Sequence, residues 1–142
     1  MSLFLKSFKY VLSCIFSVEK IVLDTNFLLA VFELKVDIFA EIERVCDFRY
    51  ELFILDRTLD EVENLIKSSL LSKRRAAKGA LQLIKLKNIQ ILASNDSRMV
   101  DDILVDLKGY IIATVDMELK RRLRKEGIQI ITIRQKKYIM LE

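Results

Sequence analysis

Acidic residues in this chain recur beside short apolar runs, at spacings that could bring them to one site. They are Asp24 in IVLDTNFLL, Glu61 in TLDEVENL, the pair Asp101 and Asp102 in MVDDILVDL, and Asp116 in IIATVDMEL. Carboxylate oxygens are hard ligands that suit Mg²⁺ or Mn²⁺, and several of them together support metal-assisted phosphate chemistry. The chain has no histidine, which excludes histidine-based acid and base catalysis. Any hydrolysis would therefore depend on carboxylates, a metal ion and water.

Apolar runs and helical periodicity indicate the elements that would position these acids. Runs of mostly branched apolar residues predict strands at residues 20–24, 51–55, 89–92, 110–114 and 128–133. Helical patterns lie between them, at residues 27–48 with a break near Lys35, 57–69, 73–87, from the turn at 94–96 to about 108, and 117–126. Gly109 and Gly127 stand where helices would stop. Continuously apolar strands that alternate with helices indicate a parallel sheet covered on both faces.

The strand order decides whether the acids meet. In open parallel sheets the ligand site forms beyond the carboxyl ends of the strands, where the strand order reverses. Asp24 ends the first predicted strand and Asp116 follows the fourth. In an order 3-2-1-4-5 these strands are neighbours, so the two carboxylates would meet. Glu61, in the helix after the second strand, and Asp101 or Asp102, before the fourth, would reach the same cleft.

Length and composition favour one domain over residues 1–142. Of the 142 residues 52% are hydrophobic, enough for a single core, and no proline marks an internal boundary. We expect residues 1–19 to form an N-terminal arm or helix on a core of residues 20–141, because lysines interrupt their apolar stretch and no cleavage site follows. No apolar run reaches the ~18 residues that cross a bilayer, so a cytoplasmic protein without membrane contact is expected. Cys14 and Cys46 lack a metal-binding spacing and are expected to be buried thiols.

Basic residues are segregated along the chain, whose formal net charge is +4. Residues 64–95 contain no acid but seven cations, among them Lys73, Arg74 and Arg75. A second basic cluster occupies residues 120–125, and residues 134–137 add three further cations. Such segregation is typical of nucleic-acid binding, although each cluster taken alone could equally be a solvated helix face.

Four segments, IVLDTNFLL, LDEVENL, VDDILVDL and YIIATVDMELKRRLRKEGI, resemble the PIN-domain nucleases of the VapC-like superfamily. The likeness is strongest to the archaeal and eukaryotic branch that processes ribosomal RNA. It covers residues 20–141 in consistent order, and ATVDMELKRRLRKEGI is its most specific piece. The resemblance implies an α/β fold: a three-layer α/β/α, Rossmann-like sandwich around a parallel sheet of about five strands. It also implies one or two Mg²⁺ or Mn²⁺ ions and cleavage of single-stranded or structured RNA.

The resemblance assigns roles to particular residues. The family's first, second and fourth acids fall on Asp24, Glu61 and Asp116, and the third falls on Asp101 or Asp102. Supporting roles fall on Asn26 and Thr114, which would orient the acids, and on Glu118, which would bind a second metal ion through water. The RNA backbone would be held by Lys73, Arg74, Arg75, Lys120, Arg121, Arg122, Arg124 and Lys125.

Each acid also has a structural explanation. Asp24 and Asp116 could cap the helices that follow them, Glu61 could be a solvated helix charge, and the acidic pair could stabilise a first helical turn. Four such coincidences at the predicted strand ends are a weaker explanation than a shared metal site.

The resulting prediction is an endoribonuclease that uses a metal ion and water. Because water attacks the phosphorus, the products would carry a 5′ phosphate and a 3′ hydroxyl. The role expected is ribosomal RNA processing. A ribosome-assembly partner and a homodimer are both left open. The alternatives are a VapC-type toxin held by an antitoxin, and an inactive PIN-fold module that only binds RNA.

Overall fold

A six-stranded sheet organises the chain in the computed structural model, which describes residues 17–142. Its order is β3-β2-β1-β4-β5-β6, and β1 to β5 run parallel. The strands are β1 (Glu19–Leu23), β2 (Tyr50–Leu55), β3 (Gln90–Leu92), β4 (Ile111–Ala113), β5 (Ile130–Arg134) and β6 (Tyr138–Leu141). The predicted order 3-2-1-4-5 is confirmed, and it places β1 beside β4 with Leu23 opposite Ala113.

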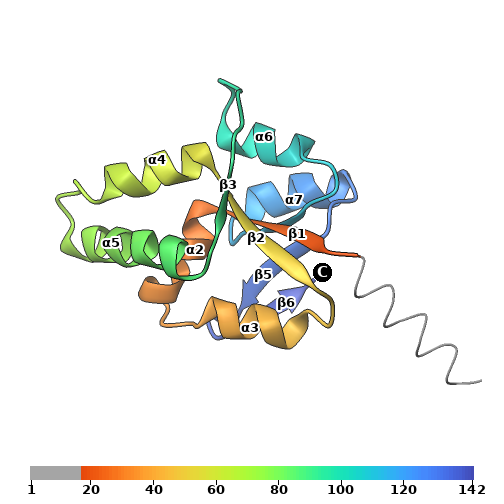
Figure 1. Cartoon of the computed structure of the whole chain (residues 1–142), viewed down its shortest axis with the longest axis horizontal. Coiled ribbons are helices and arrows are strands. Elements are labelled where there is room, and N and C mark those ends of the chain that lie inside the picture. The colour runs from red at the N-terminus through yellow and green to blue at the C-terminus, as the bar shows by residue number, and fades with distance from the viewer. Residues whose placement is uncertain (1–16) are drawn as a thin grey trace, which may run out of the picture.

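Six helices of the described residues connect and cover the strands (Figure 1). They are α2 (Thr25–Glu33), α3 (Ile38–Val45), α4 (Asp56–Leu65), α5 (Leu71–Leu86), α6 (Val100–Asp106) and α7 (Met117–Lys125). The predicted break near Lys35 falls between α2 and α3, where Lys35 has a φ of 55°. Gly109 and Gly127, with φ of 80° and 70°, follow α6 and α7 as expected.

The two faces of the sheet carry separate apolar clusters. Ile21 and Leu23 of β1 pack with α2 to α5, whereas Val22 between them packs with α6 and α7. This alternation follows from the period of two along a strand. Figure 1 shows α6 and α3 on opposite sides of the strands. The predicted three-layer α/β/α arrangement is therefore confirmed.

One strand was not predicted. β6 runs antiparallel to β5, with Arg134 opposite Tyr138. The turn between them has positive φ at Gln135 (53°) and Lys136 (56°), and the Lys137 amide donates to the Arg134 carbonyl at 3.0 Å. Two-residue hairpin turns with positive φ at both central residues usually contain Asn-Gly or Asp-Gly, and neither dipeptide is present here. The hairpin signal is therefore missing from the sequence.

Some expectations concern the ends and the surroundings of the fold. Residues 1–16 of the predicted arm, Cys14 among them, lie outside the described residues. Cys46 is a buried free thiol, as expected. None of the helices in residues 17–142 is long and apolar enough to span a membrane.

Candidate active site

Asp24 is the buried acid at the carboxyl end of β1. It caps α2, since its Oδ1 accepts from the Thr25 amide at 2.9 Å, and its Oδ2 accepts from the Thr114 hydroxyl at 2.9 Å. Burial raises the pKa of Asp24 to about 6, although these two hydrogen bonds lower it in part. The charges of Asp101 and Glu61 raise it further, which places both acids within electrostatic reach of Asp24.

Thr25 connects Asp24 to the second acid. Its hydroxyl donates to Glu61 Oε2 at 2.8 Å, so α2 and α4 present their acids side by side. The resemblance implies a supporting role for Asn26, the next residue, which is exposed; that role stays a prediction. Thr25 was missed because a hydroxyl next to an acid in the DTN turn has several possible partners, and the position of α4 selects Glu61.

Thr114 is the polar residue shared by two acids. Its hydroxyl donates to Asp24, and the Asp116 amide donates to the same oxygen at 3.2 Å. Asp116 then caps α7, because its Oδ1 accepts from the Leu119 amide at 2.9 Å. Capping is thus a real role of Asp24 and of Asp116, and it orients each carboxylate without using all of its acceptor sites.

Asp101 lies in the first turn of α6 and belongs with these acids. Burial raises the pKa of Asp101 above its ordinary value, and the charge of Asp116 is the next cause. Glu61 and Asp102 raise it further, while Arg122 lowers it. Asp101 thus lies within electrostatic reach of Asp24, Glu61 and Asp116, beyond the ends of β1 and β4.

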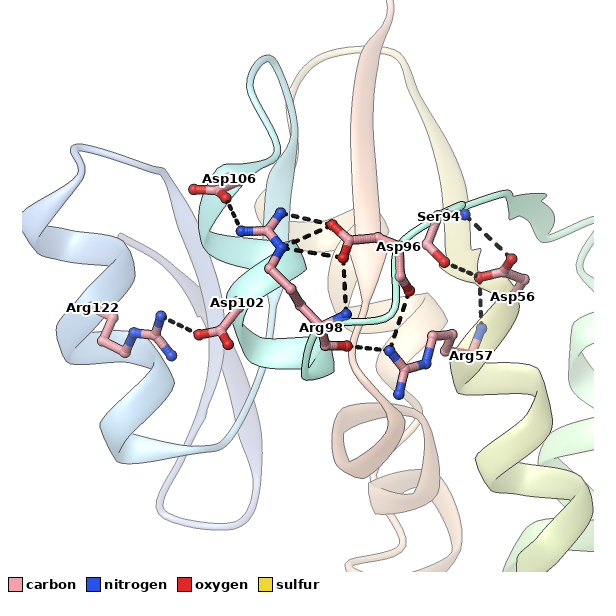
Figure 2. Close-up of polar contacts among 8 residues, drawn as sticks. All are labelled: Asp56, Arg57, Ser94, Asp96, Arg98, Asp102, Asp106 and Arg122. Carbon is pink, nitrogen blue, oxygen red and sulfur yellow. Dashed lines mark hydrogen bonds and ion pairs between the residues drawn. The ribbon is translucent and has the colours of Figure 1, made fainter.

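Its neighbour Asp102 faces a different partner. Asp102 Oδ1 accepts from Arg122 of α7 at 2.7 Å, an ion pair that ties α6 to α7 (Figure 2). Glu118 is likewise engaged elsewhere, since it pairs with Arg121 at 2.6 Å on the exposed side of α7. The structure thus turns Asp102 and Glu118 to arginines, whereas Asp24, Glu61, Asp101 and Asp116 remain within electrostatic reach of at least one other acid of this set.

The four acids fit a hard divalent cation by the chemistry of their oxygens. Two of them, Asp24 and Asp101, also have raised pKa values to which neighbouring carboxylates contribute, a repulsion that a cation would relieve. As the side chains stand, no three acidic or thiol groups of residues 17–142 lie close enough to enclose an ion. Metal binding would require rotation of these side chains toward a common point.

The predicted basic surface needs one correction. Lys120 is buried and its Nζ donates to the Thr132 hydroxyl at 3.0 Å, so it cannot hold a phosphate. Burial lowers the pKa of Lys120. The cause is the register of α7, which turns Leu119, Lys120 and Leu123 toward the sheet. The KRRLRK run does not reveal which cation faces inward.

The other predicted cations are on the surface, several of them in ion pairs. Lys73 pairs with Glu33, Arg121 with Glu118, and Arg124 with Glu142. Arg121, Arg122 and Lys125 line a hollow of about 520 Å³ beside α7. Among the described residues Lys125 has no ion pair, which makes it the α7 cation with the least competition for a phosphate.

The chain is similar to known proteins in sequence and in fold. A family described as PIN like domain matches residues 21–136. Ribonuclease VapC4 of Methanocaldococcus jannaschii is 37% identical over 123 residues, which cover 84% of this chain and 93% of that protein. A solved structure of the PIN domain endonuclease Utp24 superposes with a TM-score of 0.70 at 26% identity, covering 87% of this chain and 90% of the other.

Proposed function

This chain belongs to the PIN-like domain family, and from that membership we propose that it is a metal-dependent endoribonuclease. The observation that carries the proposal is a set of hydrogen bonds at the carboxyl ends of β1 and β4. Thr25 connects Asp24 to Glu61, and Thr114 connects Asp24 to Asp116. Asp101 lies within electrostatic reach of Asp24, Glu61 and Asp116. Ligands bind at this position in open α/β sheets. The similarity to a ribonuclease and to a PIN endonuclease supports RNA as the substrate.

These four acids are the proposed ligands of Mg²⁺ or Mn²⁺. A bound divalent cation would lower the pKa of water and stabilise the charge that develops on the phosphate. The Thr114 hydroxyl orients Asp24 by donating to it and orients Asp116 by accepting from its amide. The Thr25 hydroxyl orients Glu61. We propose Asp101 rather than Asp102 as the third ligand, because Asp102 is held by Arg122.

The RNA backbone is proposed to run over cations on the surface of α5 and α7. Lys125 and Arg121 of α7 line the same hollow, and Arg74 and Arg75 lie on α5. Contacts of this kind fix the position of the strand and carry little sequence information. Cleavage should therefore depend on RNA shape and strandedness more than on a long base sequence.

Ribosomal RNA processing remains the proposed role. The similarity to VapC4 over most of its length supports the alternative, a VapC-type ribonuclease whose activity an antitoxin controls. Co-purification separates the two roles: a toxin should bring down a small protein that inhibits cleavage, whereas a processing enzyme should bring down precursor ribosomal RNA.

A cleavage assay with matched glutamate variants tests the activity. We expect the parental protein to cut labelled single-stranded or hairpin RNA with Mn²⁺ or Mg²⁺, to stop with chelator, and to leave 5′ phosphates. Glu61→Gln should remove most of this activity because a ligand charge is lost. Glu63→Gln is the control, since Glu63 is exposed on the same helix. Cleavage that chelator does not diminish would refute the metal mechanism.

A further inference from the structure

The loop between β3 and α6, residues 93–99, is fastened to the start of α4. Asp56 accepts from the Ser94 hydroxyl at 2.8 Å and from the Ser94 amide at 3.2 Å. Arg57 Nη1 donates to the carbonyls of Asp96, at 3.4 Å, and of Arg98. Figure 2 shows both α4 side chains reaching this loop. A loop without regular structure thus has its course fixed from the helix that carries Glu61.

Arg98 then joins the loop to the far end of α6. Its guanidinium holds Asp96 at 2.7 Å and Asp106 at 2.6 Å, and its amide donates to Asp96 Oδ1 at 2.9 Å. Arg98 therefore links the loop to α6 (Figure 2).

α6 packs through its apolar residues, but its first turn lacks a side-chain cap. It has seven residues, and its N-cap residue, Met99, makes no side-chain capping hydrogen bond. On the side that faces α7, the ion pair between Asp102 and Arg122 holds α6. Arg57 supplies the corresponding attachment on the flank toward α4.

The position of Arg57 relates this attachment to Glu61. Arg57 and Glu61 are four residues apart on α4, so they lie on one face of the helix. The same face thus presents Glu61 to the acids and holds the loop that leads, three residues after Arg98, to Asp101. These contacts connect the helix that carries Glu61 to the loop before Asp101, although the two acids belong to helices on different faces of the sheet.

We propose that Arg57, together with Asp56, is a positioning residue that sets Asp101 opposite Glu61 for cation binding. The inference rests on the proposed function for its consequence, and on the contacts of Arg57 and Asp56 for its geometry. Neither residue supplies a ligand. Arg57 acts through two main-chain carbonyls, so a lysine, which can also donate to carbonyls, retains part of the effect.

The test measures cation affinity and loop protection on the full chain. Mn²⁺ binding is followed by electron paramagnetic resonance, and amide exchange of residues 94–103 by mass spectrometry or NMR, for Arg57→Ala and Arg57→Lys. Arg57→Ala should weaken Mn²⁺ binding about 10-fold, the loss typical when a residue that orients a ligand is removed. It should also speed exchange in residues 94–103, and Arg57→Lys should fall between it and the parental protein.

Arg44→Ala is the matched control. Like Arg57, Arg44 donates from its guanidinium to a main-chain carbonyl, that of Ile139 at 3.1 Å. It also pairs with Glu41, and it joins α3 to β6 rather than α4 to the loop. This variant should change neither Mn²⁺ affinity nor exchange in residues 94–103. If Arg44→Ala and Arg57→Ala give the same losses, the proposal is overturned.

A double variant separates action through Asp101 from general loosening. In an Asp101→Asn background, Arg57→Ala should cause no further loss of Mn²⁺ affinity, because the ligand that it positions is absent. The same loss in both backgrounds would overturn the proposal. If the parental protein binds no Mn²⁺, the proposed function fails, and amide exchange alone then tests whether Arg57 holds the loop. Faster exchange of residues 94–103 in Arg57→Ala would support that role. Unchanged exchange would overturn it.

Discussion

At the scale of single residues, Asp24 combines a structural role with an unfavourable charge. It caps α2 and accepts from Thr114, yet it is buried beside other carboxylates, so its pKa rises to about 6. In the unfolded chain the pKa of an aspartate is near the ordinary 3.8. Between these two values the folded protein retains a proton that the unfolded chain has lost, so stability falls as pH rises.

Asp24→Asn should therefore stabilise the metal-free protein at neutral pH. The gain should reach up to about 3 kcal/mol in free energy of unfolding at pH 7.5, since one pKa unit corresponds to about 1.4 kcal/mol. It should shrink toward zero as pH falls to 4, where the parental carboxyl is neutral. Urea unfolding in chelator from pH 4 to 7.5 measures this, and a gain that does not depend on pH would contradict it.

Thr25 offers a second test at this scale. Thr25→Val keeps the shape and the capped amide but removes the hydroxyl that donates to Glu61. We expect cleavage to fall about 10-fold, the loss typical of a residue that orients a ligand, while Thr25→Ser keeps most of the activity. Equal rates for the valine and serine variants would show that this hydrogen bond does not orient Glu61.

At the scale of elements, the basic run of α7 does not reveal in which direction each of its cations points. Its cations point in different directions: Lys120 lies under the helix, Arg122 holds α6, and Arg124 holds Glu142 at the end of the chain. Only part of the basic run is therefore available to RNA.

The salt dependence of RNA binding should reveal that division. Lys125→Ala and Arg121→Ala should each flatten the plot of log affinity against log salt by roughly 0.7, the value for one contact with a single strand. Lys120→Met should leave the slope unchanged, because Lys120 is buried. A lower slope for Lys120→Met, with parental slopes for the other two, would contradict the assignment.

The elements also show which parts of the fold and the site can be predicted from the sequence. β1 and β4 follow from their apolar runs, and their adjacency explains why Asp24 and Asp116 approach each other. β6 was missed because its turn lacks the usual residues. The choice of Asp101 over Asp102, the hydrogen bond from Thr25 and the contacts of Arg57 depend on how helices pack against one another, which local patterns do not encode.

At the scale of the whole molecule, the acids come from both layers of helices. Asp24 and Glu61 lie with the layer of α2 to α5, and Asp101 and Asp116 with that of α6 and α7. A cation held by all four would link the two layers across the end of the sheet. Binding of this kind stabilises the folded state over the unfolded chain.

Mn²⁺ should therefore raise the melting temperature of the parental protein. At a free concentration about 100 times Kd, the free energy of unfolding should increase by about 2.7 kcal/mol. Asp116→Asn should lose most of this increase because a ligand charge is gone, although the Asn side chain can still cap α7. Thermal unfolding at several Mn²⁺ concentrations measures the effect, and equal shifts in both proteins would remove Asp116 from the site.

The central claim is that Asp24, Glu61, Asp101 and Asp116 jointly bind a divalent cation, and a Mn²⁺ titration of two neighbouring variants tests it most directly. Asp101→Asn removes a proposed ligand, whereas Asp102→Asn removes the adjacent charge that pairs with Arg122. The account predicts binding by the parental protein, a loss of about 10-fold or more in Asp101→Asn, and near-parental affinity in Asp102→Asn. Parental affinity in Asp101→Asn, or a larger loss in Asp102→Asn, would contradict it.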